Sequence, residues 1–346
     1  PYYLGNLLYD KGQWERAVTY FELSVSIKND FPTVHRNLSL AYFNKLHDAE
    51  KALAEMETAF SLDEKDSRVF LELEQLYKRL NYPISTRLEN MKAHLDLVET
   101  RDTLYTEYIT LLNLNHEYET ALEKTSTHIF HPWEGGEGKI TAQYRMSHIE
   151  IAKKSLSNNN IDCAISHLKT ALTFPLNLGE GKLIGQKDND IYYLLGIAYE
   201  KLGNTEMANE NFILSSLGND TLDCAMYYND QPPEMFFYQA LADMKLGKKV
   251  EAFGKFNKLI DYGENHIFDN VAIDYFAVSL PDFLIYEADL DEKNYVHCCY
   301  LIALGKFGLG EYETSISYFE KGLALDTSHV GLHTHLILTN TYHAFI

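Results

Sequence analysis

The 346-residue chain carries 50 acidic and 30 basic side chains, for a formal net charge of −20, and 46% of its residues are hydrophobic. A surface this negative repels phosphate backbones and anionic lipids, which argues against nucleic-acid and membrane partners. The 13% aromatic content excludes a disordered chain. No apolar run is long enough to span a bilayer.

The four cysteines show no metal-ligand spacing, so we expect reduced thiols, no bound metal and a cytoplasmic setting. The sequence also lacks phosphate-binding loops and other cofactor motifs, so no cofactor is expected. The chain does not begin with Met, and its first repeat is expected to be truncated. We therefore expect it to be part of a longer protein.

Seven times along the chain, a small residue is followed four positions later by a larger residue. The pairs are Ala17/Phe21, Ala52/Met56, Ala121/Thr125 (the weakest), Ala164/Leu168, Ala208/Phe212, Ala252/Phe256 and Ser315/Phe319. The clearest copy is preceded by Tyr192-x2-Leu195-Gly196-x2-Tyr199. This pattern resembles the tetratricopeptide repeat (TPR), which has two helices in about 34 residues. The resemblance implies an all-α, right-handed superhelix of about seven or eight helix pairs, an α-α solenoid.

The spacing of these marks predicts two regions. Residues 1–100 are expected to hold regular repeats, the first truncated and the third degenerate. Residues 101–346 are expected to hold repeats with loop insertions and a C-terminal capping helix, because the marks there are 43, 44, 44 and 63 residues apart. Within helix pairs, Gly203 and Gly247 fall where a left-handed residue is expected. His329 and His333 are expected on the surface of the final helix.

Four insertions are predicted, at residues 131–139, 175–190, 227–234 and 274–291, from their Gly and Pro content or their place between repeats. Equivalent connections of a solenoid emerge along one edge, so we expect the four insertions to be neighbours. The apolar stretch 275–286 is compatible with either a short helix or an extended segment.

The first two insertions contain an internal duplication. Pro132, Gly136, Glu137, Gly138 and Lys139 recur 43 positions later as Pro175, Gly179, Glu180, Gly181 and Lys182. Glu137 and Glu180 are therefore expected at equivalent points of adjacent repeats, about 10 Å apart. Two interpretations stay open: a ligand contact, or a carboxylate placed near a helix N-terminus, where its charge is favourable.

Acids, amides and aromatic rings gather in these insertions, a mixture that suits a neutral polyhydroxylated ligand such as a carbohydrate. The candidate ligand-binding residues are His131, Trp133, Glu134, Glu137, Lys139, Glu180, Lys182, Tyr227, Tyr228, Asn229, Asp230, Glu234, Asp274, Tyr275 and Asp282. A pair of carboxylates could also hydrolyse a glycosidic bond, with Glu137 and Glu180 as catalytic candidates.

The strings FHPWEGGEGK (130–139), NLGEGK (177–182), YYNDQPPE (227–234) and DYFAVSLPDF (274–283) carry a second resemblance. They are similar to the C-terminal TPR region of bacterial domain-of-unknown-function 5107 proteins. That resemblance implies an N-terminal β-rich domain of the sugar-mutarotase type, absent here, and a link to carbohydrate metabolism. It identifies no enzymatic residues.

Three hypotheses follow from the sequence. The first is a binding module whose insertions form an acidic and aromatic pocket for a carbohydrate. The second is the helical half of an enzyme of the glycoside hydrolase class, although this piece alone is expected not to be an enzyme. The third is a protein–protein interaction scaffold that holds a partner protein or peptide in its concave groove.

Overall fold

The computed structural model describes residues 1–131, 133, 136–183, 185–222, 231–272 and 285–341. Contacts divide the chain into two units, which are described separately. The first consists of Pro1–Tyr108 and Phe283–Asp289, and the second of Ile109–Asp282 and Leu290–Ile346. The described residues form α-helices and one short 3-10 helix, which confirms the predicted all-α fold of stacked helix pairs.

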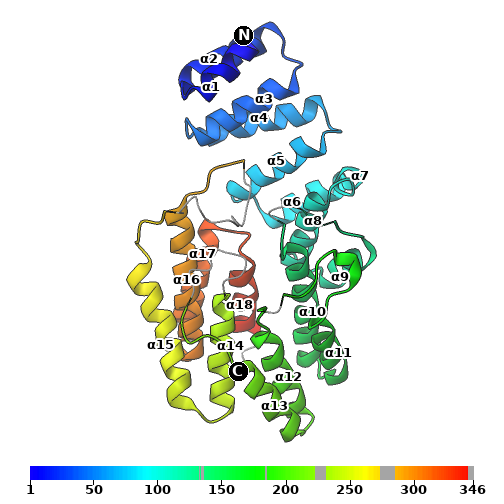
Figure 1. Cartoon of the computed structure of the whole chain (residues 1–346), viewed down its shortest axis with the longest axis vertical. Helices are drawn as coiled ribbons and strands as arrows, with labels where there is room; N and C mark the ends of the chain where they lie inside the picture. Colours follow the sequence, from blue (N-terminus) through cyan, green and yellow to red (C-terminus); the bar gives the residue numbers. More distant parts are fainter. Residues whose placement is uncertain (132, 134–135, 184, 223–230, 273–284, 342–346) are drawn as a thin grey trace. The chain divides into compact units, whose positions relative to one another are not determined.

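The first unit is built from the helices at the blue and cyan end of the chain (Figure 1). They are α1 (Tyr2–Asp10), α2 (Trp14–Ile27), α3 (Pro32–Asn44), α4 (Ala49–Leu62), α5 (Ser67–Arg79), α6 (Ile84–Ala93), α7 (Leu95–Val98) and α8 (Asp102–Leu114). The division between the units falls within α8. At the start of α5, the Asp66 carboxylate accepts from the N–H groups of Arg68 (2.9 Å) and Val69 (3.2 Å), an ordinary N-terminal cap.

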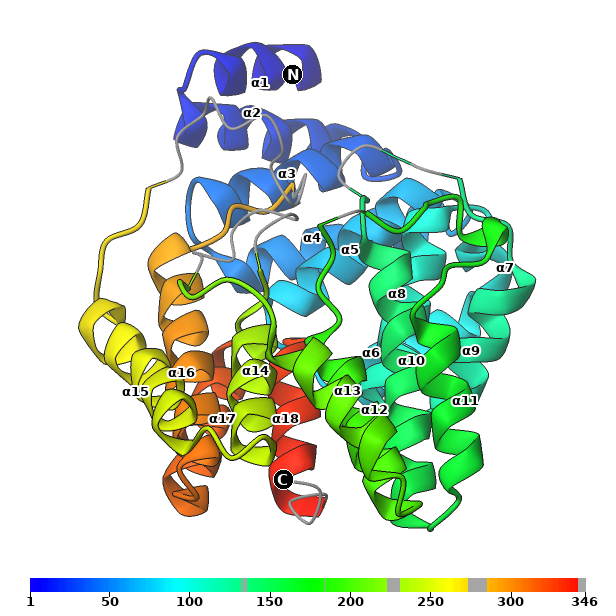
Figure 2. The same cartoon turned by 60° about the horizontal axis from the view of Figure 1, so that its bottom comes forward.

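The second unit continues the series, and its paired helices lie side by side in both views (Figure 2). Its elements are α9 (Tyr118–Thr127), α10 (Lys139–Ser157), α11 (Ile161–Ala171), η1 (Leu176–Leu178), α12 (Asn189–Lys201), α13 (Thr205–Ser216), α14 (Pro233–Lys245), α15 (Lys249–His266), α16 (Leu290–Gly308), α17 (Tyr312–Leu325) and α18 (Val330–Thr341). Helix α18 packs beside α14 and α16, because His335 contacts the rings of Phe237 and Tyr300.

Each helix pair turns through one residue with a left-handed backbone. These residues are Gly12, His47, Asn81, His116, Asn159, Gly203, Gly247 and Gly310, with φ between 53° and 79°. Glycine, asparagine and histidine tolerate this conformation better than β-branched residues. The predictions for Gly203 (φ 71°) and Gly247 (φ 79°) are confirmed. The described chain therefore contains eight helix pairs, within the predicted number.

The repeat marks form the contact between the two helices of a pair. All seven small residues are at most 3% exposed, and their partners four positions later are at most 2% exposed. In the clearest copy, a Cβ on Gly196 would lie 2.4 Å from the ring of Phe212. Only glycine lets α12 and α13 approach this closely, which explains why the pattern has a glycine there.

Candidate peptide-binding surface

The first two predicted insertions contact one another in the second unit. The Phe130 N–H donates to the carbonyl oxygen of Asn177 at 2.8 Å. The Asn177 side-chain amide donates in turn to the carbonyl oxygens of Thr125 and His128, both at 2.8 Å. Residues that lie about 50 positions apart are thus held together, as expected for equivalent connections of adjacent repeats.

The duplicated acids also lie near one another. The N–H of Gly138, the N-cap of α10, donates to Oε2 of Glu180 at 2.9 Å. Burial raises the pKa of Glu180, the Gly138 hydrogen bond lowers it, and the nearby Glu137 carboxylate raises it. The Glu180 carboxylate thus serves a helix N-terminus, the second of the two interpretations open at the sequence level. Glu180 belongs to the second insertion, whereas α10 follows the first insertion.

Other described candidates of these insertions support the loops themselves. The Lys182 ammonium donates to the carbonyl oxygen of Leu172 at 3.0 Å and forms an ion pair with Asp188. The Trp133 ring covers Gly136, where an added Cβ would lie 2.1 Å from the ring. The remaining candidates differ in exposure: His131 and Glu137 are exposed, and Lys139 is half-buried.

The structure does not describe eight of the candidate residues. They are Glu134, Tyr227, Tyr228, Asn229, Asp230, Asp274, Tyr275 and Asp282. The stretch 273–284 also lies outside the described residues, so the choice between helix and extended segment stays open there. The site residues predicted from the insertions remain a prediction.

Glu234 is half-buried in the first turn of α14, within a cluster of polar side chains. Its Oε2 accepts a hydrogen bond from the Tyr300 hydroxyl at 3.3 Å. Burial is the main cause that raises the pKa of Glu234, to about 7. The Tyr300 oxygen also lies 3.0 Å from Nδ1 of His335, whose pKa burial lowers to about 3.

Three histidines of the last repeat make internal contacts rather than forming a polar surface. His335 is 4% exposed. Nε2 of His333 lies 2.7 Å from the carbonyl oxygen of Thr327, and the Leu332 N–H donates to Nδ1 of His329 at 3.1 Å. Both side chains are half-buried, and His329 lies one residue before α18 rather than on it. Burial lowers the pKa of both. Leu332 and Leu338 of α18 are buried in the hydrophobic core of the second unit.

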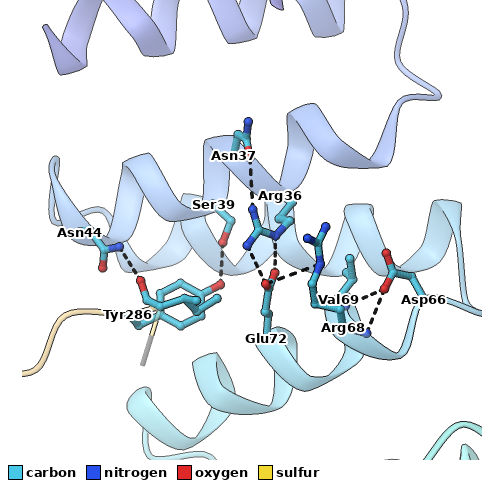
Figure 3. A network of polar contacts seen from close by, with 10 residues as sticks. Arg36, Asn37, Ser39, Asn44, Asp66, Arg68, Val69, Glu72 and Tyr286 are labelled. Atoms are coloured by element: carbon cyan, nitrogen blue, oxygen red, sulfur yellow. Dashed lines mark hydrogen bonds and ion pairs between the residues drawn. The ribbon is translucent and has the colours of Figure 1, made fainter. Parts of the chain in front are cut away.

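The first unit contains a different kind of site, in which helix α3 holds a non-helical segment of the chain, residues 285–287 (Figure 3). The Asn44 side-chain amide donates to the carbonyl oxygen of Ile285 at 2.7 Å and accepts from the Glu287 N–H at 2.8 Å. An asparagine side chain carries one donor group and one acceptor, as a backbone peptide does. Asn44 therefore recognises the backbone of the segment rather than its side chains.

The residue between these two hydrogen bonds inserts its side chain. Tyr286 is 1% exposed, and its ring meets the ring of Phe43 edge to face, with centroids 5.0 Å apart. Its hydroxyl lies 3.1 Å from the hydroxyl of the fully buried Ser39. Burial raises the pKa of Tyr286. The site thus satisfies both parts of a tyrosine, the apolar ring and the polar tip.

The next side chain of the segment is an acid that meets a base. The Lys45 ammonium forms an ion pair with Glu287, and it lies 5.2 Å from the centre of the Trp14 ring. The hydrogen bond to Glu287 is the main cause that raises the pKa of Lys45. We refer to Ser39, Phe43, Asn44 and Lys45 together as the α3 surface.

Other side chains of α3 bond to the neighbouring helices α1 and α5 and hold α3 in position. The Arg36 guanidinium donates to both carboxylate oxygens of Glu72 on α5, at 2.5 and 2.6 Å. The Asn37 amide donates to the Asn6 side chain on α1 at 3.0 Å. Figure 3 shows Arg36 and Glu72 beside the Tyr286 hydroxyl. Because Arg–carboxylate pairs of this kind are directional, they hold α3 in register with its neighbours.

Sequence reasoning missed this site. Asn44 and Ile285 are 241 positions apart, and neither belongs to a repeat mark or a motif. The one available signal was the placement of Tyr286 at the end of the apolar stretch 275–286, followed at once by an acid.

Comparison with known proteins found one family model and several solved structures of low identity. The tetratricopeptide repeat family model matches residues 190–214 and 296–329, which correspond to α12–α13 and α16–α17. A solved tetratricopeptide repeat protein from Parabacteroides merdae is 14% identical, with 90% of this chain and 99% of that chain covered and a TM-score of 0.42. The C-terminal part of a TPR repeat-containing protein from Cytophaga hutchinsonii is 13% identical, with 97% and 99% covered and a TM-score of 0.26.

No described helix combines the length and the apolar character that crossing a bilayer requires. The finer resemblance to domain-of-unknown-function 5107 proteins stays a prediction. The tetratricopeptide repeat model thus matches two of the helix pairs, and the buried repeat marks and left-handed turns recur in the other described pairs.

Proposed function

We propose that this chain is a protein–protein interaction scaffold whose α3 surface binds a peptide segment of a partner. The observation that carries the proposal is the pair of hydrogen bonds from the Asn44 amide to the backbone of residues 285 and 287. Main-chain hydrogen bonds supply affinity for a non-helical peptide, and pockets for its side chains supply specificity.

The charge of the surface supports a peptide rather than a sugar. Lys45 is a base in a chain with an excess of 20 acids, and it pairs with an acid of the bound segment. The ring of Phe43 and the hydroxyl of Ser39 fit a tyrosine side chain. A backbone clamp with an aromatic pocket and a neighbouring cation matches the chemistry of a short acidic peptide.

Selection from a displayed library of random peptides tests the proposal without a known partner. The full chain is expected to enrich peptides whose binding falls at least tenfold on Asn44→Ala. The matched control is Glu137→Gln in the first insertion, which is exposed and is expected to leave binding unchanged. Peptides that bind both variants equally would contradict the proposal. So would no enrichment even with the Tyr286→Ala chain, whose bound segment lacks its buried ring.

The carbohydrate hypothesis for the insertions remains open to the same kind of test. Its support is the nearness of Glu137 and Glu180, although the Glu180 carboxylate already accepts from Gly138. Titration calorimetry against a panel of oligosaccharides is expected to show binding that Glu180→Gln weakens if the insertions hold a sugar. Hydrolysis of a glycoside by the full-length protein, lost on Glu137→Gln or Glu180→Gln, would favour the enzyme alternative.

A further inference from the structure

The segment that occupies the α3 surface belongs to the same chain, although it lies more than 240 positions after α3. It makes three independent kinds of contact there: backbone hydrogen bonds to Asn44, a buried ring against Phe43 and an ion pair to Lys45. A loop that merely joins α15 to α16 does not require any of these contacts with α3. The contacts have the character of ligand recognition.

We propose that residues 285–287 are an intramolecular ligand that occupies the peptide-binding surface, and that a partner must displace them to bind. This inference rests on the proposed function and adds the class of partner to it. The partner carries a tyrosine followed directly by an acidic residue, in a non-helical segment that presents its backbone to Asn44.

The two side-chain positions account for this specificity. Ser39 is fully buried and its hydroxyl lies 3.1 Å from the tyrosine oxygen, so a phenylalanine in the partner would leave a buried polar group without that contact. Lys45 favours an acid at the next position and repels a base there. A partner of the form tyrosine–acid reproduces both contacts of the chain's own segment.

Tethering makes the chain's own segment a strong competitor. A linked segment meets its site in an intramolecular step, so its occupancy does not depend on the concentration of the chain. A free peptide at micromolar concentration is then at a disadvantage, although it can make the same contacts. The site is consequently closed to weak ligands until the segment is removed or displaced.

The experiment uses a synthetic peptide with residues 283–290 (FLIYEADL) as the probe, titrated by fluorescence anisotropy against the full chain. We expect Tyr286→Ala in the chain to tighten peptide binding at least tenfold, because this change weakens the internal competitor and leaves the α3 surface intact. Adding Asn44→Ala to that variant is expected to abolish binding. Circular dichroism establishes that each variant keeps its helical content.

Peptide variants test the specificity on the Tyr286→Ala chain. Probes that carry Tyr286→Phe, Tyr286→Ala or Glu287→Lys are expected to bind progressively less well than the parent peptide, with at least a tenfold loss for the last two. A second chain variant, Glu287→Ala, is expected to open the site through the ion pair alone, with a smaller gain. This variant keeps the buried ring and serves if Tyr286→Ala fails to fold.

Each contrary outcome has a separate meaning. Equal binding of the probe to the parent chain and to both opened variants would overturn the idea that the segment blocks the site. Absence of probe binding to every folded variant would overturn the assignment of the segment as a ligand. Library peptides that still depend on Asn44 would show in either case that the proposed function holds while this inference fails.

Discussion

Glu234 is a carboxylate placed where its neutral form is favoured. It lies in the first turn of α14 and accepts from Tyr300, while the nearby Asp190 carboxylate adds to the effect of burial in raising its pKa. The pKa is about 7 in the folded chain, against an ordinary value of 4.5. The unfolded chain therefore releases this proton at a lower pH than the folded chain does.

This difference predicts a pH dependence of stability. Below about pH 4.5, Glu234 is protonated in both states and does not lower the free energy of unfolding. As the pH rises from 4.5 to about 7, ionisation in the unfolded chain lowers the free energy of unfolding. Glu234→Gln keeps a neutral side chain at every pH, so we expect it to exceed the parent chain in stability by about 1–3 kcal/mol at pH 8. Urea unfolding at pH 5 and pH 8 measures the difference.

The control at this site is Glu137→Gln, an exposed acid whose replacement is expected to change stability by less than about 0.5 kcal/mol at either pH. A gain for Glu234→Gln that is the same at pH 5 and pH 8 would contradict a role for the carboxylate proton.

For single residues, the sequence predicted where a side chain such as Glu180 lies but not what it contacts. The offset of 43 residues placed Glu180 beside the first insertion, because repeats stack in register. It left open whether Glu180 meets a ligand or a helix terminus, since that depends on where the Gly138 N–H points. Asn44 was beyond prediction because its partners are defined only by the folded arrangement of distant segments.

Among the elements, α10 depends on a residue outside its own helix. Its N-cap is Gly138, which offers no side chain to cap the first turn, and no acid lies in that turn. The Glu180 carboxylate supplies the missing acceptor from the next insertion. It therefore couples the first two insertions to the start of a long, buried helix.

Glu180→Ala is expected to lower the unfolding free energy of the second unit by about 1 kcal/mol, the usual effect of losing an N-terminal cap. Thermal unfolding followed by circular dichroism measures the loss. Glu137→Ala, on the exposed neighbour, is the matched control and is expected to have little effect. A larger loss for Glu137→Ala than for Glu180→Ala would show that the cap is assigned to the wrong acid.

The helices themselves were predictable from the sequence because their signals are local. Ala208 and Phe212 mark one face of α13, and Gly203 marks the turn before it, all within ten residues. The insertions carried no comparable periodicity. Their Gly and Pro residues predict only that helices stop, so the sequence fixes neither the path nor the contacts of residues 285–287.

For the whole molecule, the central claim is that one segment far along the sequence is a ligand of the first unit. Between α3 and residue 285 the chain forms helices α4 to α15, and residue 285 then meets α3 through the Asn44 hydrogen bond. The proposal therefore gives one chain both a peptide-binding surface and the peptide that occupies it. Binding of a partner then requires exchange rather than simple addition.

The most direct measurement is hydrogen exchange of the Glu287 amide in the full chain. Because that N–H donates to Asn44, we expect it to be protected in the parent chain. Asn44→Ala is expected to lower its protection factor at least tenfold. Asn37→Ala, on the same helix but bonded to Asn6, is expected to leave the protection unchanged. A Glu287 amide that exchanges at the rate of an unprotected peptide in the parent chain would contradict the account.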